Sequence, residues 1–64
     1  MSSSYFVGGF ARDGREINGG EYANHDAALV ALEHFENNVP AVTSMSVWEY
    51  SDDGSENELE GFAR

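Results

Sequence analysis

Hydrophobic residues recur with helical spacing along one stretch of the chain, from residue 25 to residue 37. A step of about 100° per residue gathers the apolar positions on one side, and these are Ala28, Ala31, Leu32 and Phe35, with Leu29 at the edge. Asn24 is a good N-cap, so the helix should begin at His25, and Asp26 suits the positive end of the helix dipole. Pro40 cannot continue a helix, so we expect it to end at Asn37-Asn38. The pattern predicts an amphipathic helix that lies on a sheet.

The residues before this helix predict a hairpin. Ser4 to Arg12 mixes aromatic residues with a valine and two glycines, and Asp13-Gly14 follows directly as a strong turn signal. Arg15 to Tyr22 could be the returning strand around Ile17. Because Asn18-Gly19-Gly20 interrupts it, we expect any second strand to be short or bulged.

The residues after the helix predict a second hairpin. Ala41 to Tyr50 is rich in residues that favour extended structure, Asp52-Asp53-Gly54 turns the chain, and a final strand runs from about Glu56 to Phe62. The length allows one domain, residues 1–64, with residues 1–3 as a frayed N-terminus. The expected fold class is α+β, with one amphipathic helix packed on an antiparallel sheet of three or four strands.

Composition narrows the class of partner. The chain has twelve Asp and Glu residues, three arginines and no lysine, for a formal net charge of −9. This charge repels nucleic acid and anionic membranes and favours basic partners. The absence of cysteine excludes disulfides, Cys-based zinc sites and thiol nucleophiles. Residues 1–11 have no basic region and only a short apolar patch, so neither a signal peptide nor a membrane span is expected, and we predict a cytoplasmic protein.

Three glutamates alternate along the last predicted strand. Glu56, Glu58 and Glu60 should stand in a row on one face, about 6.6 Å apart. Pairing with the preceding strand places Trp48 and Tyr50 on that same face, although the register could slip by one residue. The opposite face then carries three apolar residues, Met45, Val47 and Leu59, which fit under the helix.

Aromatic residues framed by carboxylates offer apolar contact area and charge to a basic surface. The predicted partner-binding residues are Trp48, Glu49, Tyr50, Asp52, Asp53, Glu56, Glu58 and Glu60. Alternative roles stay open for each of these features. The glutamates would also protect an exposed edge strand from aggregation. The aromatic residues would also pack against the first hairpin or close the interface of a homo-oligomer, and the acidity would also suit a small regulatory protein of a salt-adapted organism.

The sequence contains few motifs that indicate catalysis or metal binding. Without lysine there is no phosphate-binding loop of the P-loop type, and His25 and His34 fall on opposite sides of the helix, so they cannot share a metal through it. A partial EF-hand match from Glu49 to Glu60 has strands in place of flanking helices. We expect no enzyme, no cofactor and no bound metal.

The order of elements, a strand over residues 5–12, a helix over 24–37 and a hairpin over 41–62 in an acidic chain, resembles that of small phage-encoded inhibitors of the anti-CRISPR type. The resemblance covers most of the chain as a general plan and includes no diagnostic motif. It implies a mode of action in which carboxylates occupy the basic nucleic-acid-binding surface of a partner complex in the host cytoplasm, with no direct contact to nucleic acid.

Overall fold

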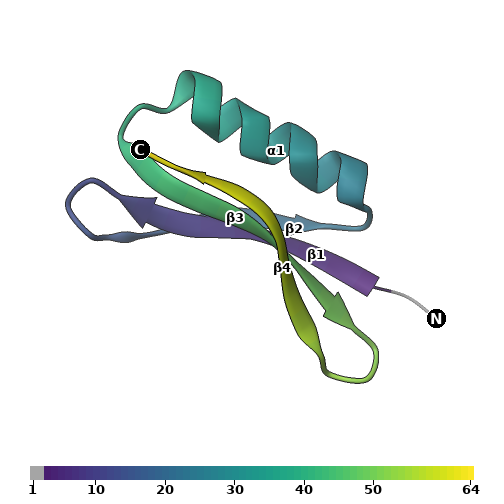
Figure 1. Ribbon diagram of the computed structural model, residues 1–64. Helices are drawn as coiled ribbons and strands as arrows, with labels where there is room; N and C mark the ends of the chain where they lie inside the picture. The colour runs from purple at the N-terminus through teal and green to yellow at the C-terminus, as the bar shows by residue number, and fades with distance from the viewer. Residues whose placement is uncertain (1–2) are drawn as a thin grey trace.

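A computed structural model describes residues 3–64, which form four strands and one helix. Strands β1 (Ser3–Ala11) and β2 (Glu16–Tyr22) precede helix α1 (His25–Asn38), and β3 (Val42–Ser51) and β4 (Glu56–Ala63) follow it. The strands pair antiparallel in the order β2-β1-β3-β4, and α1 covers one face of the sheet (Figure 1). The predicted α+β fold is confirmed, with four strands.

The predicted fraying of residues 1–3 is wrong for its last residue. Ser3 is the first residue of β1 and pairs with Ser51 of β3. Met1 and Ser2 lie outside the described residues.

Both hairpins close with the same turn. The N–H of Gly14 donates to the carbonyl of Ala11 at 2.9 Å, and the N–H of Gly54 donates to that of Ser51 at 3.0 Å. Each glycine has a φ of 87°, a left-handed conformation that glycine adopts without a steric penalty. The two Asp-Gly pairs therefore form the turns that the sequence predicts.

A β-bulge in the first hairpin changes which residues of β2 face α1. Val7 pairs with Gly20 and Gly8 pairs with Asn18, which leaves Gly19 without a partner in the register. Because of this extra residue, Ile17 and Tyr22 both pack against the core although they are an odd number of positions apart. The second strand is thus present and bulged, as the sequence predicts.

Helix α1 begins and ends where the sequence predicts. The Asn24 side-chain oxygen accepts a hydrogen bond from the N–H of Ala27 at 2.8 Å and caps the helix. Ala28 and Leu32 are buried against the sheet. The other predicted core-facing residues are partly buried against the same core, and they are Leu29, Ala31 and Phe35.

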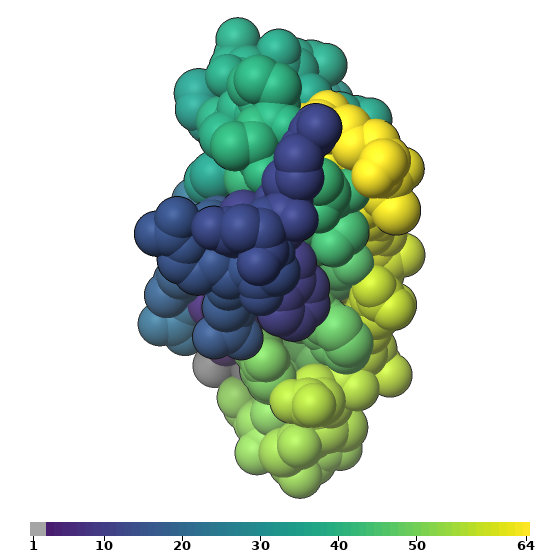
Figure 2. All heavy atoms as spheres, turned by 90° about the vertical axis from the view of Figure 1, so that its left-hand side faces the viewer, coloured from purple at the N-terminus to yellow at the C-terminus, as the bar shows by residue number. Residues whose placement is uncertain are grey.

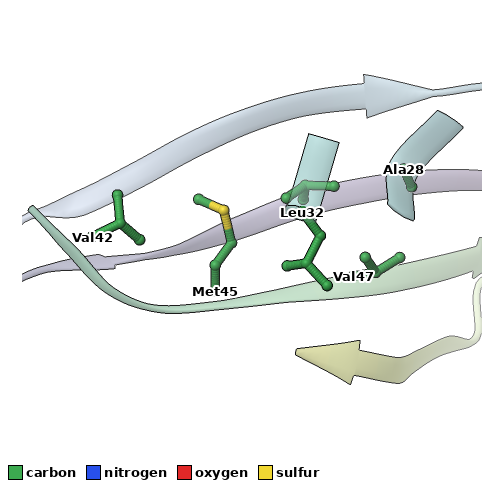
Figure 3. Close-up of a cluster of buried hydrophobic side chains, with 6 residues drawn as sticks. Ala28, Leu32, Val42, Met45 and Val47 are labelled. Atoms are coloured by element: carbon green, nitrogen blue, oxygen red, sulfur yellow. The ribbon is translucent and has the colours of Figure 1, made fainter. Parts of the chain in front are cut away.

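The core lies between α1 and the two central strands. Its buried members come from β1, α1 and β3, and they are Val7, Ala28, Leu32, Val42, Met45 and Val47 (Figure 3). No helix within residues 3–64 is long and apolar enough to cross a membrane.

The second hairpin gives the molecule its elongated shape. The principal extents are 36 × 20 × 15 Å. The β3–β4 turn projects away from α1, which Figures 1 and 2 both show at the lower end of the molecule. Within residues 3–64, no helix covers the sheet face opposite α1, which we call the open face (Figure 1).

Candidate protein-binding face

The open face carries aromatic side chains on its two central strands. Val7 and Val47 are fully buried beneath α1, and neighbouring residues of a strand point to opposite faces. Phe6 on β1 and Trp48 on β3 therefore lie on the open face, where they are direct partners in the register. Phe10 lies on the same face and is 51% exposed.

A glutamate flanks the Phe6–Trp48 pair on each side. Glu21 on β2 is the partner of Phe6, and Glu58 on β4 is the partner of Trp48. One row across the sheet thus reads Glu21, Phe6, Trp48, Glu58, and both glutamates are exposed. Three strand spacings separate the ends of this row, so the two glutamate backbones lie about 14 Å apart.

Two further pairs extend the same pattern. Phe10 is the partner of Glu16, and Tyr50 is the partner of Glu56. Aromatic residues thus occupy the central strands and carboxylates the edge strands. We call this set the aromatic–acidic face, and it consists of Phe6, Phe10, Glu16, Glu21, Trp48, Tyr50, Glu56 and Glu58.

The arginines lie outside this set. Arg12 and Arg15 belong to the β1–β2 turn, where the guanidinium of Arg15 is 3.1 Å from the carboxylate of Asp13. Arg64 donates hydrogen bonds to backbone carbonyls at the C-terminal end of α1. The aromatic–acidic face therefore carries negative charge, and none of its residues is basic.

A hollow of about 290 Å³ opens on this face. It is lined by Phe6, Gly8, Gly9, Phe10, Glu16, Ile17, Asn18 and Trp48. The Phe6 ring lies over Gly8, since a Cβ atom at Gly8 would be 2.5 Å from Cε2 of that ring. Glycine at this position leaves room for both the ring and the hollow.

The expected ladder of three glutamates on one face is wrong. Trp48 pairs with Glu58 and Val47 pairs with Glu60, so a β-bulge leaves Leu59 without a partner in the register. Beyond the bulge the alternation is inverted, and Glu60 lies on the same face as the buried Val47. Leu59, which was expected in the core, is 40% exposed.

Glu60 and Glu49 belong instead to a cluster at the start of α1. The carboxylate of Glu60 is 3.1 Å from Nε2 of His25, whose ring stacks on Tyr5 with centroids 5.7 Å apart. The Tyr5 hydroxyl donates to Glu49 at 3.2 Å. Desolvation, followed by the hydrogen bond to Glu49 and its negative charge, raises the pKa of Tyr5. His25 is half-buried here, and neither glutamate extends the aromatic–acidic face.

The two turn aspartates differ in their surroundings. The Asp53 carboxylate accepts hydrogen bonds from the hydroxyl of Ser55 at 2.7 Å and from its N–H at 2.9 Å. These bonds hold the pKa of Asp53 below its usual range. Asp52 is exposed beside it. Of the eight predicted partner-binding residues, the four that the structure brings together on the open face are Trp48, Tyr50, Glu56 and Glu58.

Sequence reasoning missed the contribution of the first hairpin to this face. Glu16 and Glu21 flank the aromatic pairs from β2, but they are five residues apart, which regular alternation would place on opposite faces. The Gly19 bulge brings them to one face. The Gly-Gly pair was the available signal, because glycine inside a strand often marks a bulge.

Within residues 3–64, no group of three or more histidine or acidic side chains is placed to hold a metal ion. The segment with the partial EF-hand spacing forms parts of β3 and β4 and the turn between them. Comparison with protein-family models, with curated proteins and with solved structures found no significant match to this chain.

Proposed function

We propose that this protein is a non-enzymatic inhibitor that binds a basic surface of a nucleic-acid-binding protein through its aromatic–acidic face. The observation that carries the proposal is the row Glu21, Phe6, Trp48, Glu58 across the sheet. An apolar centre with a polar rim is the usual anatomy of a protein–protein interface, and Trp and Tyr are enriched among the residues that contribute most to binding.

Charge selects the class of partner. Four exposed glutamates line the two edges of the face, and the formal net charge of the chain is −9. A basic surface would be attracted from a distance and would find a carboxylate on either side of the aromatic centre. A second copy of this chain would oppose carboxylates to carboxylates, and nucleic acid would bring phosphates against them.

The proposed nucleic-acid-binding character of the partner rests on the chemistry of phosphate recognition. Lysines and arginines that contact phosphates also attract rows of carboxylates, and charge-assisted hydrogen bonds form with either group. The acidic α+β plan is similar to that of small phage-encoded inhibitors of the anti-CRISPR type, which supports the same mode of action. Binding at such a surface would compete directly with nucleic acid.

A matched pair of double variants tests whether the face, and not the overall charge, binds the partner. Glu56→Gln/Glu58→Gln removes two charges from the face, and Glu33→Gln/Glu36→Gln removes two from the exposed side of α1, so both variants change the net charge from −9 to −7. The probe is a peptide of alternating Gly-Arg-Ser and Gly-Lys-Ser repeats. Its binding is measured by the change in fluorescence of Trp48, the single tryptophan. Glu56→Gln/Glu58→Gln removes two exposed ion pairs with the peptide and should weaken its binding by roughly 3- to 10-fold.

The helix variant should bind within about twofold of the wild-type chain, because its glutamates lie away from the face. Equal weakening by both variants would show that only the net charge matters and would overturn the proposal. Sedimentation across protein concentration distinguishes the homo-oligomer, in which the same face would already be covered.

A pull-down from a bacterial lysate tests the class of partner. We expect to recover nucleic-acid-binding proteins with the wild-type chain and with Glu33→Gln/Glu36→Gln, but not with Glu56→Gln/Glu58→Gln. A single-stranded DNA oligonucleotide should release these proteins from the wild-type chain. Retained proteins that bind no nucleic acid, or that DNA does not displace, would contradict the proposed inhibition.

A further inference from the structure

The hollow on the open face combines aromatic walls with a single carboxylate. Among the described residues that line it, Phe6, Phe10 and Trp48 are aromatic, and Glu16 is the one that carries a charge. Gly8 lies beneath the Phe6 ring and contributes no side chain to fill the space. The hollow is thus a small apolar site with negative charge at one side.

We infer that this hollow holds one arginine side chain of the basic partner, an inference that rests on the proposed function. A cation is attracted by the faces of aromatic rings, and tryptophan is the strongest of these partners. Glu16 is exposed, and Glu21 and Glu58 lie in the neighbouring row. An anionic side chain would be repelled by these carboxylates, and a neutral apolar one would gain no electrostatic attraction from them.

Arginine fits these walls better than lysine. The guanidinium is planar and weakly hydrated, so it stacks on a ring while its in-plane N–H groups still reach a carboxylate. A lysine ammonium is strongly hydrated and offers a point charge. Asn18 is held at the wall of the hollow because its side-chain oxygen accepts a hydrogen bond from the N–H of Gly20 at 2.8 Å. The amide oxygen of Asn18 has a second lone pair, which can accept a hydrogen bond from a guanidinium.

The chain itself shows the same pairing elsewhere. The guanidinium of Arg64 lies 4.9 Å from the centre of the Phe62 ring and donates to backbone carbonyls at the same time. No arginine is found among the described residues that line the hollow, and Arg15 is engaged with Asp13. The site is therefore open to a guanidinium from outside.

Three peptides of equal length test the inference: Gly-Arg-Ser repeats, Gly-Lys-Ser repeats, and repeats with uncharged citrulline in place of arginine. Trp48 fluorescence follows their binding to the intact chain. The arginine peptide should bind roughly fivefold more tightly than the lysine peptide, as expected for one cation–π site. The citrulline peptide should not bind measurably.

Phe10→Ala removes one wall and should weaken the binding of the arginine peptide more than that of the lysine peptide, so that the preference for arginine is abolished. Phe10 is 51% exposed and lies outside the core, so the variant should fold. Val30→Ala is the matched control, since Val30 is 68% exposed on α1, away from the face. Gly8→Ala is a second variant, because its methyl group would displace the Phe6 ring, and it should also abolish the preference.

The two proposals fail differently in this experiment. If the wild-type chain binds arginine and lysine peptides equally, or if Phe10→Ala and Gly8→Ala keep the preference, the arginine site is wrong while the acidic face stands. If neither charged peptide binds, the proposed function is wrong, and the arginine site with it.

Discussion

Arg64 connects the end of β4 to the C-terminal end of α1. Its guanidinium donates to the carbonyls of Glu36 at 2.7 Å, Val39 at 2.9 Å and Val42 at 3.0 Å. The last carbonyls of a helix have no partner within the helix, and a cation there also opposes the negative end of the helix dipole. One side chain thus caps the helix and holds it to the strand that begins the second hairpin.

Replacing Arg64 should therefore cost stability. Arg64→Met is expected to lower the free energy of unfolding by about 1.5–3 kcal/mol, the range for hydrogen bonds made by a charged group. Arg64→Lys should lose less, because an ammonium keeps the charge but not the fork of donors. Urea unfolding followed by circular dichroism measures both.

Arg15→Met is the control for this series. Arg15 pairs with Asp13, but their side chains are 78% and 58% exposed, so the loss should stay below about 0.5 kcal/mol. An Arg64→Met variant as stable as Arg15→Met would show that the cap contributes nothing.

The pairing of the described strands is interrupted at three places, and two of these, the bulges in β2 and β4, decide which charged residues lie on the open face. The bulge in β2 brings Glu16 and Glu21 to the same side. The bulge in β4 separates Glu58 from Glu60 and leaves Leu59 unpaired. Without them, each edge strand would present a different set of charges.

The β4 bulge predicts how two apolar residues respond to mutation. Leu59 is unpaired and 40% exposed, so Leu59→Gln should change the free energy of unfolding by no more than about 0.5 kcal/mol. Met45 is 1% exposed, so Met45→Ala should cost about 2–5 kcal/mol. Thermal and urea unfolding give both values, and a large loss for Leu59→Gln would mean that Leu59 is in the core and the bulge is absent.

The molecule as a whole carries far more negative than positive charge. Two of the three arginines are engaged with Asp13 or with backbone carbonyls, and the aromatic–acidic face is not neutralised. Because the formal net charge is −9, the carboxylates repel one another in the compact fold, which lowers the stability of the protein at low salt. At 10 mM salt the screening length is about 30 Å, close to the 36 Å length of the molecule.

Salt should therefore stabilise the fold without being required for it. Between about 10 mM and 300 mM NaCl, the Tm should rise by roughly 5 °C, because screening reduces the self-repulsion. Helical circular dichroism should be present already in dilute buffer. A chain that folds only in molar salt would support salt adaptation as the reason for its acidity, and an unchanged Tm would show that self-repulsion is unimportant.

The sequence by itself determined the elements. Helical periodicity and the Asn24 cap placed α1, and the two Asp-Gly turns, which need a left-handed glycine, placed both hairpins. These are local effects, since each depends on residues within a few positions of one another. The partners of Trp48 and Tyr50 across the second hairpin were also predictable, because they lie between the turn and the bulge.

Only the tertiary structure decided which residues share the open face. A bulge shifts every later residue of a strand to the opposite face of the sheet. The bulge in β4 therefore places Glu60 beside His25, and the bulge in β2 places Glu21 beside Phe6. The pairing of β1 with β3 then brings Phe6 beside Trp48 from the other half of the chain. Such neighbours depend on long-range register and on the position of an unpaired residue. The Gly-Gly pair signals the bulge in β2, but no local preference specifies the bulge in β4 or the pairing of β1 with β3.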